Sequence, residues 1–136
     1  RLFLVYGPHQ DDRFFIPQLL HSRNSAEPLL MTAGEQTRDF VWVGDAVEVL
    51  LQLGLRPDLK GHSFNVCTGQ ETSIREVVEM VSELCGKWLG GGLGKLTYRP
   101  KEIFRIVGNP AALQENLGIR PTTPLRQGLE AIMGGY

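Results

Sequence analysis

The distribution of hydrophobic and polar positions divides the chain into short apolar runs and longer amphipathic stripes. Residues 1–6 (RLFLVY) form a run that stops at Gly7-Pro8, which is typical of a strand buried on both faces and followed by a turn. Shorter runs of the same kind predict further strands at residues 29–32, 39–43, 62–66 and 96–98.

Apolar residues at helical spacing predict the helices between these strands. The clearest helix begins at Ser73, because Glu76 three positions later completes a capping-box pattern. An apolar stripe follows, and Gly86 is placed to end the helix. The other helices are predicted to begin near Asp12, Val43, Asn109 and Thr123.

Strands that alternate with helices in this way predict an α/β fold. Residues 1–6 and 62–66 are expected to form a parallel pair, because helices separate them along the chain. The length of 136 residues leaves room for one domain, so we expect residues 1–136 to fold as a single unit.

Composition narrows the classes of function. Hydrophobic residues make up 42% of the chain, which argues against disorder, and 14 Lys and Arg against 15 Asp and Glu give a net charge of −1. A nearly neutral chain is not expected to bind nucleic acid through a basic surface. No apolar run approaches the roughly 20 residues that span a membrane, and we expect a cytoplasmic protein. The chain begins at Arg1 rather than at methionine, which suggests a fragment of a longer protein.

The motifs that could indicate a phosphate-binding loop, a dinucleotide site, a metal site or a cysteine nucleophile are all incomplete. The run GGGLGK (residues 90–95) lacks a Ser or Thr after its lysine and a strand before it, so a flexible connector is favoured over a phosphate-binding loop. No GxGxxG motif follows a predicted strand, so a complete dinucleotide site is not expected. No metal site is predicted from the scattered histidines, Cys67 has no visible activating base, and Cys85 completes an apolar stripe.

Several segments in order resemble the C-terminal half of an extended short-chain dehydrogenase/reductase, the NAD-dependent nucleotide-sugar epimerase/dehydratase family. The resemblance extends over nearly the whole chain and implies a partial Rossmann-type sheet with two parallel strands, short strands and covering helices. The segments that carry it are RLFLVYGPHQ (residues 1–10), GEQTRDFVWVGD (residues 34–45), FNVCTG with TSIRE (residues 64–76), RIVGNP (residues 105–110) and LGIRP (residues 117–121).

The resemblance implies substrate binding without the catalytic half. Family members carry NAD on an N-terminal domain and use a Tyr-x-x-x-Lys pair, but Tyr6 and Tyr98 are followed four positions later by Gln10 and Glu102, and Tyr136 ends the chain. We therefore expect no catalytic residue, no cofactor bound by this chain alone and no dehydrogenase, epimerase or dehydratase activity from it.

The same resemblance assigns the site residues. Arg38 and Arg105 match two arginines that bind the substrate's pyrophosphate, and we expect both guanidinium groups to face one cleft. Asn65 is placed near the nucleotide, although an asparagine before a tight loop is equally often a backbone cap. In an intact protein, residues Leu2, Phe3 and Leu4 would lie near the nicotinamide.

Some positions depart from the family pattern, and a rival hypothesis stays open. Leu4 stands where an asparagine commonly contacts the substrate, and Gly44 and Asn109 each replace an aspartate. The leading hypothesis is the part of a sugar epimerase or dehydratase that binds a nucleoside-diphosphate sugar. The alternative is a stand-alone, non-catalytic domain that works by protein association. In either case we expect a homodimer through the unpaired edge of the strand at residues 1–6.

Overall fold

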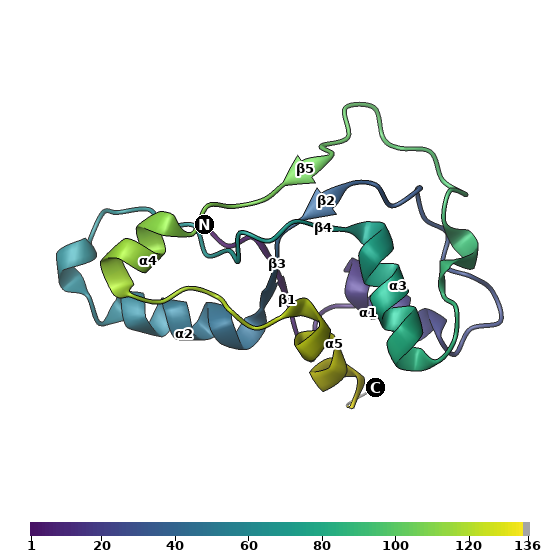
Figure 1. Cartoon of the computed structure of the whole chain (residues 1–136), viewed down its shortest axis with the longest axis horizontal. Coiled ribbons are helices and arrows are strands. Elements are labelled where there is room, and N and C mark those ends of the chain that lie inside the picture. Colours follow the sequence, from purple (N-terminus) through teal and green to yellow (C-terminus); the bar gives the residue numbers. More distant parts are fainter. Residues whose placement is uncertain (135–136) are drawn as a thin grey trace.

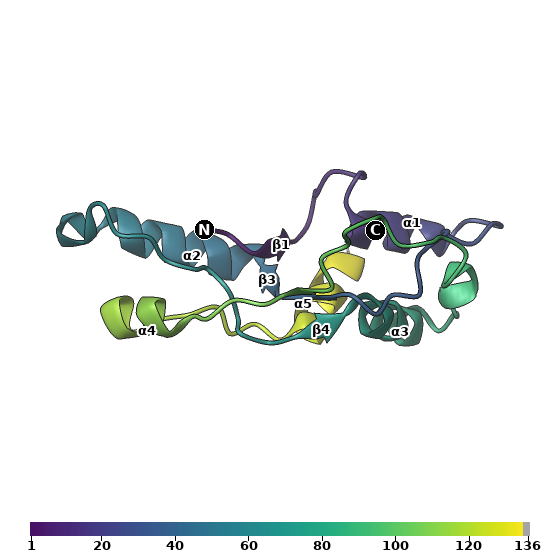
Figure 2. The ribbon, with the colours of Figure 1, turned by 90° about the horizontal axis from the view of Figure 1, so that it is seen from above.

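The computed structural model describes residues 1–134, so Tyr136 lies outside the described residues. Figure 1 shows an elongated arrangement in which α2 and α4 occupy one end, α1 and α3 the other, and the strands lie between them. The view from above in Figure 2 separates two layers, with β1 and α1 in one and α3 and α4 in the other. The helices are α1 (Phe15–Ser22), α2 (Val43–Gly54), α3 (Ile74–Cys85), α4 (Ala111–Leu117) and α5 (Leu125–Met133).

Two small sheets hold the centre of the molecule. In the first, β1 (Leu4–Tyr6) pairs in parallel with β3 (Phe40–Trp42), and Leu4 lies opposite Phe40. In the second, β2 (Thr37–Arg38) lies between β4 (Thr72–Ser73), which is antiparallel to it, and β5 (Arg105–Ile106), which is parallel. The predicted α/β class is confirmed.

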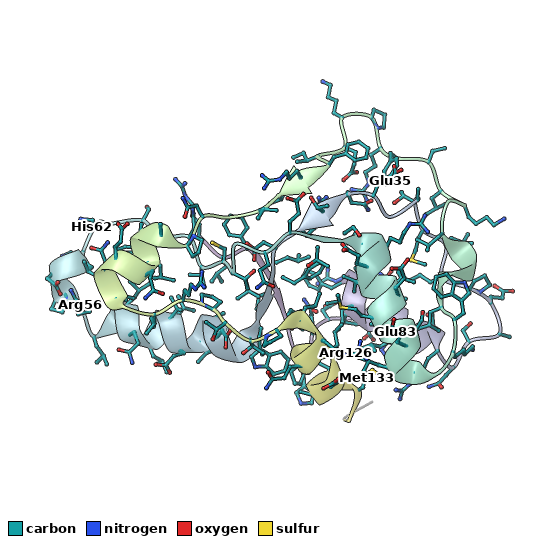
Figure 3. The ribbon with its side chains drawn as sticks, in the orientation of Figure 1. Glu35, Arg56, His62, Glu83, Arg126 and Met133 are labelled. Atoms are coloured by element: carbon teal, nitrogen blue, oxygen red, sulfur yellow. The ribbon has the colours of Figure 1, made fainter. Side chains whose placement is uncertain are left out.

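The core consists of two hydrophobic clusters, one on each face of the β1–β3 pair, because alternate residues of these strands belong to different clusters. The larger cluster lies among α1, α3 and α5 and includes the fully buried Tyr6, Leu19, Val78 and Leu129. The smaller cluster lies between α2 and α4 and includes Val41, Val49, Val66 and Leu113. At the surface of the larger cluster, Arg126 of α5 donates a 2.9 Å hydrogen bond to Glu83 of α3 (Figure 3).

The helix predicted from Ser73 forms as its capping pattern indicates. The Ser73 hydroxyl accepts a hydrogen bond from the Glu76 N–H, and the Glu76 carboxylate accepts one from the Ser73 N–H. Gly86 ends the helix in the left-handed conformation, with φ of 65°. Across the described residues, no helix is long and apolar enough to cross a bilayer.

Several predicted strands do not form. The 62–66 segment contributes one parallel bridge, between Leu2 and Val66, in which the Phe3 N–H donates to the Val66 carbonyl and the Val66 N–H to the Arg1 carbonyl. Residues 29–32 and 96–98 stay irregular, since the Met31 backbone bonds to Gly92 and Leu96 instead of to a neighbouring strand. The segment at residues 1–6 is also not buried on both faces, because Leu2 is 53% exposed.

The glycine-rich segment is an ordered turn rather than a simple connector. Gly90–Gly92 form a short 3₁₀ helix, and Gly92 is buried against the Leu29 backbone so closely that a Cβ would collide with it. The Met31 N–H donates to the Gly92 carbonyl at 2.9 Å. Glycine is needed here for this close approach and not for binding phosphate.

Candidate functional site

Arg38, at the end of β2, is held by hydrogen bonds to its own strand and to the segment before β5. Its Nη1 donates to the carbonyls of Thr37 at 2.8 Å and of Ile103 at 2.9 Å. Its Nη2 donates to the Glu102 carboxylate at 3.1 Å, and the two side chains are 17% and 19% exposed. The guanidinium is therefore fixed in position at the edge of the protein, with part of its surface open to solvent.

A turn places Glu102 beside this arginine. The Glu102 N–H donates to the Arg99 carbonyl at 3.1 Å, which closes the turn. Lys101, inside the turn, has φ of 65°, a left-handed conformation that is uncommon for a lysine. The contacts of this turn, including the hydrogen bond between Glu102 and Arg38, therefore stabilise it by more than the backbone strain at Lys101 costs.

Asp39 points to the opposite side of the segment from its neighbours Arg38 and Phe40. It is 1% exposed, and its carboxylate accepts hydrogen bonds from the Thr68, Gly69 and Gly108 N–H groups at 2.8, 2.9 and 3.2 Å. The Thr68 hydroxyl adds a fourth hydrogen bond at 2.7 Å. The chain passes from one sheet to the other at this residue, because Arg38 ends β2 and Phe40 begins β3.

Arg105 lies on the neighbouring strand but on the face opposite to Arg38. Its cross-strand partner is Thr37, whereas that of Arg38 is Ile106. Arg105 Nε donates to the Glu71 carboxylate at 2.8 Å, and the Thr37 hydroxyl donates to the same group at 2.7 Å. The hydroxyl, followed by the guanidinium, holds the pKa of Glu71 below its usual value.

This register bears on the expected clamp. The two arginines lie on adjacent strands, but they are offset by one residue and so leave the ladder on opposite sides. That both guanidinium groups contact one pyrophosphate stays a prediction. Each arginine has a different glutamate as its partner. A binding role for Arg105 stays a prediction, and Arg38 is the better candidate because its side chain is the more enclosed.

A small cavity lies between α1 and the β1–β3 pair. Its volume is about 30 Å³. Leu4 and Phe40, opposite each other in the β1–β3 pair, form its floor. Gln10 is the polar residue among those that line it, and its amide nitrogen donates to the Val5 carbonyl at 3.0 Å. The complete lining is Leu4, Gln10, Phe14, Phe15, Ile16 and Phe40.

The other predicted site residues lie elsewhere. The Asn65 amide donates a long 3.5 Å hydrogen bond to the Asn109 carbonyl, which fits the backbone role that the sequence left open. Leu2 is largely exposed and its bridge partner is Val66, while Phe3 and Leu4 are half-buried. Asn65 is therefore not brought beside Arg38 by any contact in the described part of the chain.

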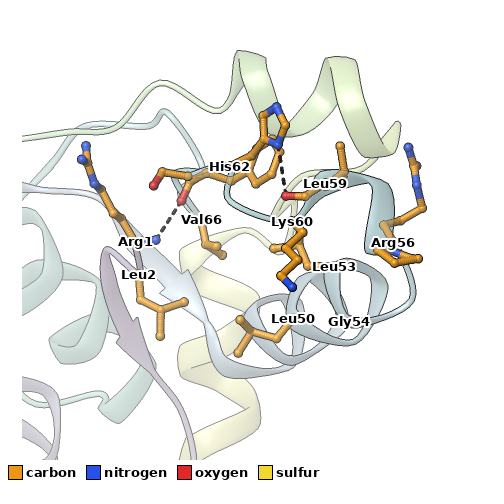
Figure 4. Close-up of a pocket in the computed structure, with 13 residues that line it drawn as sticks. Arg1, Leu2, Leu50, Leu53, Gly54, Arg56, Leu59, Lys60, His62 and Val66 are labelled. Atoms are coloured by element: carbon orange, nitrogen blue, oxygen red, sulfur yellow. Dashed lines mark hydrogen bonds between the residues drawn. The ribbon is translucent and has the colours of Figure 1, made fainter.

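A larger pocket lies at the far end, between α2 and the N-terminus (Figure 4). Its volume is about 450 Å³, and Leu2, Leu50, Leu53 and Val66 contribute apolar walls. The Arg1 ammonium donates to the Phe64 carbonyl at 2.8 Å, as drawn in Figure 4. The pocket is open to solvent, and Arg1, Arg56, Lys60 and His62 add polar groups to its apolar walls.

The Cys67 thiol is not placed to act as a nucleophile. Cys67 is fully buried, and burial followed by the nearby Asp39 charge raises the pKa of its thiol to about 11. Such a thiol stays protonated at neutral pH and is a poor nucleophile. Within residues 1–134, no cluster of histidine, cysteine and carboxylate side chains could hold a metal ion.

Sequence reasoning missed the two acidic partners, Glu71 and Glu102, and the role of Asp39. The alternation of Arg38, Asp39 and Phe40 is visible in the sequence and could have indicated that Asp39 projects away from its neighbours. The pairing of Glu102 with Arg38 had no comparable signal. The two residues are 64 positions apart in the sequence, and only the tertiary fold brings them together.

Comparison with known proteins gives the family context. Residues 1–67 match the model of the NAD dependent epimerase/dehydratase family. The GDP-6-deoxy-D-mannose reductase of Pseudomonas aeruginosa is 30% identical over 142 residues, which cover all of this chain and 46% of that protein. The CDP-abequose synthase of Salmonella typhimurium is 28% identical over 138 residues, or 98% of this chain and 46% of that one.

Solved structures show the same fold. MoeE5 in complex with UDP-glucuronic acid and NAD has a TM-score of 0.83 at 30% identity, and covers 98% of this chain and 44% of that one. The UDP-glucuronic acid 4-epimerase of Bacillus cereus, in complex with UDP-glucuronic acid and NAD, has a TM-score of 0.88 at 26% identity, with coverages of 98% and 43%. The chain thus spans less than half the length of these relatives.

Proposed function

We propose that this chain is the part of an NAD-dependent epimerase/dehydratase family enzyme that binds the nucleotide sugar, corresponding to its C-terminal half. The match of residues 1–67 to the family and the similarity of nearly the whole chain to nucleotide-sugar enzymes support this proposal. The observation that carries it is the guanidinium of Arg38, which is fixed by three hydrogen bonds and is largely enclosed.

Arg38 is suited to bind a diphosphate. A guanidinium keeps its charge at any working pH and can donate two parallel hydrogen bonds to phosphate oxygens. The bonds to Thr37, Ile103 and Glu102 hold the side chain in one orientation, which lowers the entropy lost when a ligand binds. Asp39 supports this arrangement from the other face, because its four hydrogen bonds fix the strand that carries Arg38.

The chemical step belongs to the rest of such an enzyme. In the intact protein, NAD would supply hydride transfer, and Leu2, Phe3 and Leu4 would line the approach to its nicotinamide ring. Neither Tyr6 nor Tyr98 has a lysine four positions later. We therefore expect absorbance of reduced nicotinamide to stay flat when the isolated chain is mixed with NAD and nucleotide sugars.

Titration calorimetry tests the binding proposal. The chain is titrated with UDP-, GDP-, dTDP- and CDP-sugars, and saturable binding of at least one is expected. Arg38→Gln should weaken that binding about tenfold to a hundredfold, because a charge-assisted hydrogen bond is lost. Arg105→Gln should weaken it less, since that side chain is 65% exposed and lies on the other face. Equal binding by all three proteins would contradict the proposal.

A second candidate function, protein association without catalysis, is favoured by one observation. The α2 helix exposes Leu50 and Leu51 by 51% and 61%, and the residue that follows the helix, Leu55, is exposed by 74%. An apolar face of this kind is typical of an interaction surface. If no nucleoside-diphosphate sugar binds while the chain associates through this face, the second function is the better account.

A further inference from the structure

A further cavity lies between the loop that follows α1 and the turn that follows α3, at the end of the molecule where these two helices lie (Figure 1). Its volume is about 150 Å³, which corresponds to roughly five water molecules. Its lining shares no residue with the groups that hold Arg38. One wall comes from residues 87–91, which lie between the segments that resemble the epimerase/dehydratase family. The cavity is therefore separate from the proposed nucleotide-sugar site.

Trp88 gives this cavity an aromatic wall. Its side chain is 58% exposed, whereas tryptophan is highly buried on average. The buried Gly90 lies so close to the indole that a Cβ at position 90 would collide with the ring. The backbone thus supports the indole, which offers a flat apolar surface to a molecule in the cavity.

Polar groups with unused hydrogen-bonding capacity line the same cavity. The Glu27 carboxylate has no partner among residues 1–134. Lys87 Nζ donates to the Arg23 carbonyl at 2.8 Å, which leaves two of its three donors free. The Ser25 hydroxyl accepts a 3.1 Å hydrogen bond from the Glu27 N–H and still has its own hydrogen to donate. Acceptors and donors therefore lie around an aromatic surface.

We infer that this cavity binds the pyranose ring of an uncharged sugar. A cation would be repelled by Lys87 and an anion by Glu27, and a wholly apolar ligand would leave both charges without water or a partner. A pyranose has C–H groups on one face, and their partial positive charge is attracted to the negative face of an indole. The hydroxyls at its edge both donate and accept, as the groups around Trp88 require.

Titration with methyl glycosides, followed by NMR of the indole N–H signals, tests the inference. The methyl glycosides of D-glucose, D-galactose, D-mannose and N-acetyl-D-glucosamine are added to the whole chain. The two tryptophans, Trp42 and Trp88, give one signal each, and Trp88→Phe identifies them. We expect a saturable shift of the Trp88 signal with at least one glycoside at about 1–10 mM, because so small a ligand binds weakly. The signal of Trp42, which packs against Tyr6, should not move.

Gly91→Val is the decisive variant, because it fills the cavity and removes no contact. A Cβ at this position meets the Pro28 Cβ at 3.5 Å, an ordinary van der Waals distance. The added methyl groups should weaken glycoside binding about tenfold or more. Gly54→Val makes the same change where a Cβ meets no atom within 4 Å, outside this cavity, and should leave the affinity unchanged. If Gly91→Val does not fold, Gly91→Ala replaces it.

The outcomes decide whether the cavity is a sugar site. A Trp88 shift that is lost in the Gly91 variant and kept in Gly54→Val supports the inference. Tighter binding of maltose or cellobiose than of methyl glucoside also supports it and assigns the ligand to the end of a glycan, whereas equal binding assigns a free sugar. No saturable shift with any glycoside, an unchanged affinity in the Gly91 variant, or a response to tetramethylammonium or acetate in place of the glycosides overturns it. The nucleotide-sugar proposal does not depend on these results.

Discussion

Arg38 and Glu102 form a half-buried ion pair in which the Nη2 nitrogen lies 3.1 Å from the carboxylate oxygen Oε1. Glu102 belongs to a turn that also supplies the Ile103 carbonyl to Arg38 Nη1. The arginine is therefore both oriented and neutralised by one segment. In the proposed function, a diphosphate would approach a guanidinium whose charge is already balanced.

Replacing Glu102 by glutamine is expected to strengthen nucleotide-sugar binding. The change removes a negative charge next to Arg38, and like charges near a binding site disfavour an anionic ligand. We expect affinity to rise about threefold to tenfold, since one charge is worth about 1 kcal/mol at a partly exposed site. Calorimetry on Glu102→Gln checks this.

Glu71→Gln is the matched control for that experiment. Glu71 bonds to Arg105 on the opposite face of the ladder, so its removal should leave the affinity unchanged. A loss of affinity in Glu102→Gln would show that orientation by the carboxylate matters more than its charge.

The elements with local signals could be predicted from the sequence, and those fixed by distant partners could not. Ser73, Glu76 and Gly86 define α3 within a few residues, so the prediction was accurate. The segment at residues 62–66 has the composition of a strand, but its pairing is a single bridge between Val66 and Leu2, an extent that tertiary packing decides. The faces of Arg38 and Arg105 could not be predicted for the same reason, because the register that decides them is set by tertiary packing.

Gly128 in α5 lies directly against the buried Tyr6 ring. A Cβ at this position would collide with the Tyr6 hydroxyl and approach its Cζ within 2.7 Å. Helix propensity alone favours alanine over glycine by about 1 kcal/mol, but overpacking of a core usually costs about 1–3 kcal/mol. We therefore expect Gly128→Ala to lower the free energy of unfolding, as measured by urea denaturation.

Two further variants identify the cause. Gly54→Ala, at the end of α2, places a Cβ that meets no atom within 4 Å, and it should be neutral or stabilising. In the Tyr6→Phe background, Gly128→Ala should cost less, because the colliding hydroxyl is gone. Equal costs in both backgrounds would point away from the Tyr6 hydroxyl.

The cap of α3 makes part of the stability depend on pH. Hydrogen bonds from the Ser73 N–H and hydroxyl, at 2.6 and 2.7 Å, hold the pKa of Glu76 below its usual value. Because the folded-state pKa is lowered, this contribution is present above the ordinary pKa of glutamate and is lost as pH falls through the folded value.

Urea denaturation at pH 7 and at pH 3 measures the effect of the cap. Glu76→Gln should destabilise at pH 7 and show a smaller further loss on acidification than the parent. Ser73→Ala should cost about 1 kcal/mol at pH 7 through loss of the cap. Glu79→Gln, on an exposed position of the same helix, is the control. If the parent and Glu76→Gln lose the same free energy of unfolding between pH 7 and pH 3, the assignment to Glu76 is contradicted.

The edge of the N-terminal segment predicts self-association. Arg1 and Phe3 direct their backbone bonds toward Val66, so the backbone groups of Leu2 point to the other edge, where they have no partner within residues 1–134. Leu2 and Leu50, 53% and 51% exposed, line the pocket beside this edge. An unpaired edge next to an apolar surface favours pairing with a second chain, so we expect a homodimer.

Sedimentation velocity over a range of concentrations tests the dimer. Leu50→Glu would bury a charge in the interface and should shift the chain to monomer at concentrations where the parent is dimeric. Leu30→Glu carries the same change at a leucine of similar exposure, 56%, outside this pocket, and should leave the dimer intact. A monomeric parent at high concentration, or equal dissociation of both variants, would show that the Leu2 edge does not pair with a second copy.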